Sequence, residues 1–171
     1  MKRQDWHAAI ARMPVFDTHT HLNMPGVPVP AQTFWDIAHY FWFQQELWSV
    51  GYPPDAPRLP ESQRVPAFVS AFNAVRNTHW HRVVRSICRD LYGQDLTGTD
   101  GNCTPDRVTS LDATIRERAH QPGWAQQVID RLAIRRIAVN ALSEADFPDL
   151  PGVGVAVPTW KDQRAWEERL L

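Results

Sequence analysis

Apolar residues follow helical spacing over most of the chain, and β-type runs are confined to a few short stretches. Compact apolar runs bounded by turn residues predict strands at 15–18, 134–139 and 152–157. Elsewhere apolar residues recur three and four positions apart, and capping residues, glycine or proline mark where each such stretch begins or ends. This pattern predicts helices at 5–12, 34–50, 61–77, 78–91, 104–119 and 124–132.

The helix predicted at 34–50 carries apolar and aromatic side chains on nearly all of its circumference. Thr33 can cap its start, with Asp36 in the place of a capping-box acid. A helix that is apolar on most sides is normally buried on more than one side. We therefore expect one continuous helix packed between the rest of the domain and a partner element or subunit. Its three stripes are Phe34, Ile37, Phe41 and Trp48; Trp35, His39 and Trp42; and Tyr40, Phe43 and Leu47.

The first predicted strand leads directly into two histidines one residue apart. Side chains alternate along a strand, so His19 and His21 face the same way, and Asp17 shares their parity. Neutral imidazoles suit zinc, iron or manganese, and two on one face form half of a metal site. The pattern predicts a divalent metal here, with zinc as first choice and manganese as the alternative. The competing interpretation is a pair of surface histidines at the end of a strand.

A second His-x-His, formed by His79 and His81, lies in a predicted helix. Residues two apart on a helix point about 200° from each other, so these imidazoles cannot share a metal. We interpret them as structural residues at a helix start. The four arginines around this helix are expected to form a solvated face: Arg76, Arg82, Arg85 and Arg89.

Composition narrows the classes of partner. The net charge of −1 gives no electrostatic case for binding nucleic acid or an anionic membrane. No apolar run approaches the roughly 20 residues of a membrane-spanning helix. Cys88 and Cys103 are too few and too far apart for a zinc knuckle or a disulfide framework. A cytoplasmic location is the default expectation.

An apolar strand that ends in His-x-His resembles the first strand of the amidohydrolase superfamily, which implies an α/β fold, the N-terminal part of a metal-dependent (β/α)8 TIM barrel. Ligands at the carboxyl end of a strand are where such barrels hold their chemistry. A complete barrel needs about 250 residues, so we expect the 171-residue chain to be one partial barrel domain, an N-terminal piece of a longer protein. Residues 33–133 form a helical insertion after the first strand, too long for an ordinary crossover.

Three stretches resemble the uronate isomerase family of the amidohydrolase superfamily. Phe16-Asp17-Thr18-His19-Thr20-His21-Leu22 is similar to the family's metal motif, and Ala38-His39-Tyr40-Phe41-Trp42, followed by Gly51, is similar to its His-Tyr-x-Trp segment. Val157-Pro158-Thr159-Trp160-Lys161-Asp162 resembles a later segment, in which the family has arginine where this chain has Lys161.

The resemblance implies aldose–ketose isomerisation of a hexuronate, as in D-glucuronate to D-fructuronate, in carbohydrate metabolism. His19 and His21 would bind the metal, His39 or Tyr40 would assist proton transfer or hold a hydroxyl, and Lys161 would pair with the substrate carboxylate. The family completes its metal site with an aspartate on the last barrel strand, which this chain lacks, so we expect this chain alone to be inactive. We expect the full-length enzyme to be a homo-oligomer that acts on a small-molecule uronate. Two alternatives stay open: another amidohydrolase that hydrolyses or decarboxylates a small acid, and a non-catalytic helical interaction module.

Overall fold

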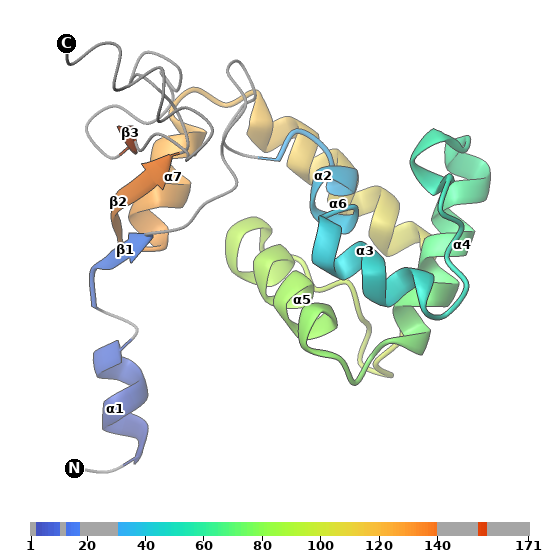
Figure 1. Cartoon of the computed structure of the whole chain (residues 1–171), viewed down its shortest axis with the longest axis horizontal. Helices are drawn as coiled ribbons and strands as arrows, with labels where there is room; N and C mark the ends of the chain where they lie inside the picture. The colour runs from blue at the N-terminus through green and yellow to red at the C-terminus, as the bar shows by residue number, and fades with distance from the viewer. Residues whose placement is uncertain (1–2, 11–12, 18–30, 140–153, 157–171) are drawn as a thin grey trace, which may run out of the picture. The chain divides into compact units, whose positions relative to one another are not determined.

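The computed structural model describes residues 3–10, 13–17, 31–139 and 154–156 (Figure 1). The chain divides into two compact units. One comprises residues 1–30 and 123–171, and the other comprises residues 31–122.

The first unit holds a parallel sheet of three strands in the order β1-β2-β3. The strands lie within the ranges predicted from the apolar runs, and the helix before β2 contacts that strand. Pairing begins at Val15, whose N–H donates to the carbonyl of Ala133 at 2.8 Å. Because the strands are parallel, their carboxyl ends all lie on the same side of the sheet, where the strands end. The elements are α1 (Arg3–Ile10), β1 (Val15–Asp17), α7 (Trp124–Arg131), β2 (Ile134–Val139) and β3 (Gly154–Ala156).

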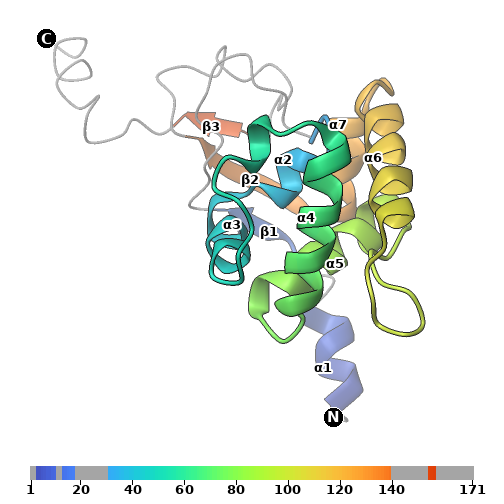
Figure 2. The ribbon, with the colours of Figure 1, turned by 90° about the vertical axis from the view of Figure 1, so that its right-hand side faces the viewer.

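The second unit is helical. The short α2 packs on α6, α3 packs on both α4 and α5, and α4 also packs on α6 (Figure 2). Residues 31–122 thus form a separate bundle that lies between β1 and β2 in the sequence. This unit ends before α7, which the predicted insertion at 33–133 includes and which belongs to the first unit. Its elements are α2 (Phe34–Ala38), α3 (Phe41–Trp48), the 3-10 turn η1 (Ala56–Arg58), α4 (Glu61–Ala74), α5 (His79–Tyr92) and α6 (Pro105–Ala119).

The core of the helical unit is an aromatic cluster centred on Phe68 of α4. Its ring meets Phe34 edge-to-face at 5.1 Å and Trp35 at 5.8 Å, and Phe72 lies 5.3 Å away. Tyr52 joins the cluster at 6.3 Å. Edge-to-face pairs add about 0.5–1.5 kcal/mol each to the free energy gained by burying the rings. The cluster therefore fixes α2, α4 and the segment after α3 against one another.

Local capping signals set most helix boundaries where the sequence predicts them. The Asp36 carboxylate accepts from the backbone N–H of Thr33 at 2.8 Å, which forms the capping box. Thr78 accepts from the N–H of His81 at the start of α5, and Gly93 ends that helix in the left-handed conformation, with φ of 72°. Pro105 occupies the first turn of α6.

The prediction of one helix over 34–50 is wrong, because the helix breaks at His39 and Tyr40. His39 has φ −95° and ψ 16°, and Tyr40 is extended, with φ −57° and ψ 130°. An unbroken helix with apolar side chains on its whole circumference would need other parts of the protein packed against every side. The break instead lets Phe43 and Leu47 of α3 join the core already occupied by α2, while Phe41 and Trp42 stay 56% and 52% exposed.

The end of α4 also differs from the sequence pattern. The predicted helix runs to residue 77, but α4 ends at Ala74 and a turn precedes Thr78. Within the described ranges, every helix is too short or too polar to traverse a bilayer.

Candidate functional site

The predicted site residues divide between the described and the undescribed parts of the chain. His19, His21 and Lys161 lie outside the described residues. β1 ends at Asp17, two positions before His19. His39 and Tyr40 are described, and they form the break between α2 and α3.

His39 is held by contacts on its ring edge and on its ring face. Its Nε2 lies 2.9 Å from the hydroxyl oxygen of Tyr52. Its ring stacks on Trp35 with centroids 5.3 Å apart and planes 28° apart. The guanidinium of Arg64 on α4 lies 4.1 Å from the centre of that same Trp35 ring. These contacts fix the plane of a half-buried imidazole.

The surroundings keep His39 and Tyr52 neutral. Burial, reinforced by the positive charge of Arg64, lowers the pKa of His39 to about 4, although Asp36 acts in the opposite direction. Burial raises the pKa of Tyr52 to about 12, and Arg64 opposes that change. At neutral pH the pair is a neutral imidazole beside a protonated phenol.

Tyr40 has a different environment from its neighbour in the sequence. Its side chain is exposed, and its ring lies 5.1 Å from that of Trp80 on α5. Its carbonyl accepts from the N–H of Gln44, which begins α3. A phenol in this position can donate a hydrogen bond to a ligand without disturbing the core.

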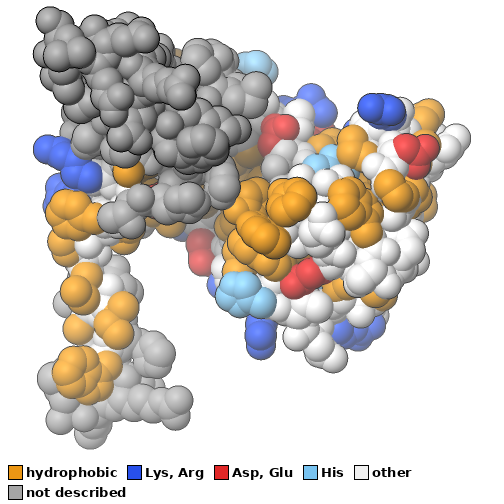
Figure 3. All heavy atoms as spheres, viewed as in Figure 1, with side chains coloured by type: hydrophobic (Ala, Val, Ile, Leu, Met, Phe, Trp, Pro, Cys, Tyr) orange, Lys and Arg blue, Asp and Glu red, His pale blue; other side chains and the backbone are white. Residues whose placement is uncertain are grey.

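Further exposed aromatic residues surround this position in the sequence. Hydrophobic side chains are visible on the face of the helical unit that Figure 3 presents, among polar and charged ones. The exposed large hydrophobic residues of residues 31–122 are Tyr40, Phe41, Trp42 and Val50.

Sequence reasoning missed Tyr52 as a partner of His39. A C-terminal motif of α3 places it: the N–H of Tyr52 donates to the Leu47 carbonyl at 3.1 Å, and that of Gly51 donates to the Trp48 carbonyl at 3.0 Å. Gly51 has φ of 93°, the left-handed conformation that this Schellman arrangement requires. The signal was present in the sequence as a glycine after the helix, but it predicts a reversal of the chain and not the contact that the reversal creates.

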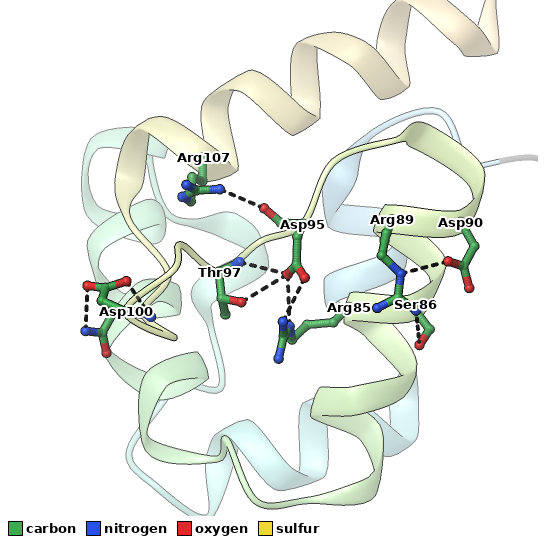
Figure 4. A network of polar contacts seen from close by, with 9 residues as sticks. Arg85, Ser86, Arg89, Asp90, Asp95, Thr97, Asp100 and Arg107 are labelled. Carbon is green, nitrogen blue, oxygen red and sulfur yellow. Dashed lines mark hydrogen bonds and ion pairs between the residues drawn. The ribbon is translucent and has the colours of Figure 1, made fainter.

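A separate polar network anchors the loop between α5 and α6 (Figure 4). Arg85 donates to both carboxylate oxygens of Asp95, at 2.9 and 2.7 Å, and Asp95 also accepts from the N–H and hydroxyl of Thr97. The Arg85 guanidinium holds the pKa of Asp95 well below its usual range. Arg107 donates to the Asp95 carbonyl at 3.1 Å. These contacts join the loop to α5 and α6, which favours a structural role for the network, and Arg85 departs from the expected solvated face.

The second His-x-His lies in helix α5, as predicted, and its two side chains have different surroundings. His79 is exposed at the start of α5, whereas His81 is buried against Phe72 at 4.2 Å with neither ring nitrogen hydrogen-bonded. Within the described ranges, no group of three or more His, Cys, Asp or Glu residues could hold a metal ion. His19 and His21 lie outside those ranges, and their assignment as metal ligands stays a prediction.

No family model matches the chain, and the search of curated proteins gives no match either. The residues of the chain itself are therefore the basis of any functional assignment.

Proposed function

We propose that the chain belongs to a metal-dependent enzyme of the (β/α)8 type that interconverts the aldose and ketose forms of a hexuronate. The observation that supports it best is the position of the histidine pair in the sequence, directly after β1. His19 and His21 follow the carboxyl end of β1 in a sheet of parallel strands in sequential order, with a helical unit between β1 and β2. Enzymes of this fold class build their sites at that end of the strands.

The donor set fits a borderline metal. Two imidazoles that follow an extended strand with alternating side chains suit zinc or manganese. A divalent metal bound there supplies the Lewis acidity that polarises a substrate carbonyl and its neighbouring hydroxyl. The isomerisation itself moves the proton on the carbon beside the carbonyl to the carbonyl carbon, while the hydroxyl proton on that first carbon moves to the carbonyl oxygen.

The other candidate residues have roles in binding and proton handling. Tyr40 presents an exposed phenol that can hold a substrate hydroxyl or pass a proton. His39 offers a neutral imidazole. Lys161 is proposed to pair with the uronate carboxylate, as a point charge without the two-pronged geometry of arginine.

One observation favours a different class of function. Phe41 and Trp42 expose more than half of their surface beside Tyr40, as residues of an interaction module would. In such a module the bundle would bind a partner protein and the histidine pair would carry no metal.

The whole open reading frame that encodes this chain should be expressed and assayed for isomerisation of D-glucuronate and D-galacturonate, with zinc or manganese added. We expect turnover that depends on metal and falls by at least about 100-fold in His19→Ala and in His21→Ala. His79→Ala is the matched control, because it removes an exposed imidazole from a His-x-His on a helix. Turnover that survives both the His19→Ala and the His21→Ala substitution would contradict the proposal, as would a complete lack of activity.

A further inference from the structure

We infer that Tyr52 is a positioning residue for the proposed isomerase. Its hydroxyl donates a hydrogen bond to Nε2 of His39, which leaves the imidazole proton on Nδ1, and His39 then serves as a neutral hydrogen-bond donor to a substrate oxygen. This inference rests on the proposed function and restricts it, because it removes His39 from the candidates for proton transfer at neutral pH.

The direction of the hydrogen bond follows from the burial of Tyr52. The residue is 2% exposed, and within the described ranges its hydroxyl has one hydrogen-bond partner, the Nε2 atom at 2.9 Å. If Nε2–H donated to the phenol oxygen, the phenol proton would be buried with no acceptor in that part of the chain, which costs about 1–3 kcal/mol. If the phenol donates instead, both atoms are satisfied. The second arrangement places the ring proton on Nδ1.

Nδ1 is available for a ligand. Within the described ranges, the hydrogen bond of the His39 ring is made by Nε2, and Nδ1 makes none. His39 is half-buried and its Nε2 edge contacts the buried Tyr52, so the Nδ1 edge is the one left for a ligand. A donor at that edge can hold a carbonyl or hydroxyl oxygen of a sugar acid.

Among the described residues, three charged or titratable groups face His39, and their balance favours the neutral ring. Arg64 approaches from α4, across the Trp35 ring on which His39 stacks. Asp36 lies on α2 beside it, and Tyr52 lies on the segment after α3. Protonating His39 would place a second positive charge near that of Arg64, which disfavours the imidazolium. It would also remove the hydrogen bond that Tyr52 donates, because a protonated Nε2 cannot accept one.

Nitrogen-15 NMR of the histidine rings tests the tautomer without any assay of activity. The purified chain is titrated from pH 8 to pH 4, and the His39 signals are assigned with a His39→Gln variant. We expect wild type to keep the Nδ1–H form and to stay neutral down to about pH 5. Tyr52→Phe removes one buried hydroxyl and keeps the ring. In this variant we expect both neutral tautomers of His39 to be populated, and the pH at which His39 is half-protonated to rise by about half a unit. Tyr40→Phe is the NMR control, because its hydroxyl has no hydrogen bond to His39.

Either of two NMR results overturns the inference: an Nε2–H tautomer in wild type, or a wild-type midpoint near 6.5. The kinetic arm uses the enzyme made from the whole reading frame. We expect Tyr52→Phe to lower kcat by about tenfold and to shift the acid limb of the pH profile upward. An unchanged pH profile and kcat would refute the positioning role while isomerase activity stands. If the unmodified enzyme shows no isomerase activity, the proposed function fails and the substrate role of His39 fails with it, whatever tautomer NMR finds.

Discussion

The buried carboxylate of Asp112 on α6 accepts a hydrogen bond at 2.8 Å from the backbone N–H of Phe34, the first residue of α2. Its second oxygen accepts from Nε of Arg116 at 2.6 Å. The first N–H groups of a helix have no partner within the helix, and a carboxylate there also interacts favourably with the helix dipole. A side chain 78 positions away in the sequence therefore helps to fix the start of the segment that carries His39.

Removing this carboxylate should destabilise the helical unit. Asp112→Ala leaves the buried N–H of Phe34 without a partner, and we expect the free energy of unfolding to fall by about 2–3 kcal/mol. Asp112→Asn keeps an acceptor but loses the charge opposite Arg116, so it should cost about half as much. Urea unfolding at pH 7 measures both. Asp90→Asn is the control, since that exposed carboxylate pairs only with the neighbouring Arg89 within the described residues. Equal losses for Asp112→Ala and Asp90→Asn would contradict the capping role.

Two arginines on α5 offer a matched pair of substitutions (Figure 4). Arg85→Lys removes the two-pronged contact with partly buried Asp95, and we expect a loss of about 1 kcal/mol at pH 7. Arg89→Lys alters an exposed pair and should leave the unfolding midpoint unchanged. Because the pKa of Asp95 is lowered in the folded chain, its contribution is complete above the unfolded value of about 3.8 and is lost as pH falls below it. The cost of Arg85→Lys should therefore shrink below pH 4, and a cost that does not change with pH would refute the assignment.

His81 should make the helical unit sensitive to acid. Burial lowers its pKa, with Arg85 and Arg76 acting in the same direction and with Asp95 and Glu46 opposing. As pH falls, the imidazole of the unfolded chain is protonated before that of the folded chain. The contribution of His81 to the free energy of unfolding is therefore fully present above about pH 6.5 and is lost as pH falls below that value.

His81→Phe replaces an imidazole that has two unpartnered nitrogens with a ring suited to the contact with Phe72. We expect higher stability at pH 7 and a weaker dependence on pH between 6.5 and 5, measured by thermal unfolding. Some acid dependence should persist, because the pKa of His39 is also lowered, to about 4. The exposed neighbour supplies the control, His79→Gln, and an identical pH dependence in His81→Phe and wild type would exclude His81 as the source.

The sequence predicts elements whose limits are set by local chemistry. Thr78 and Gly93 bound α5 because a hydroxyl cap and a left-handed glycine act within one turn of the chain. The three strands also lie within their predicted ranges, since compact apolar runs bounded by turn residues are a local signal.

Relationships made by the folded chain could not be predicted in this way. The break at His39 is invisible to periodicity, because a stretch that is apolar in every direction fits one helix or two equally well. The contact of Tyr52 with His39 depends on how the chain turns after α3 and packs on Phe68. The spacing of charged residues assigns Arg85 to an exposed helix face, but it cannot show that the loop after α5 brings the Asp95 carboxylate into contact with it.

The metal assignment to His19 and His21 is tested most directly by titrating the metal-free chain with zinc and with manganese in a calorimeter. We predict one bound ion per chain, lost in His19→Ala and in His21→Ala, and kept when exposed imidazoles elsewhere are removed by His79→Ala and His120→Ala. Weak affinity is expected with two protein ligands, since catalytic zinc sites usually have three. No binding by wild type, or equal binding by wild type and by the His19→Ala and His21→Ala variants, would contradict the metal site on which the proposed function depends.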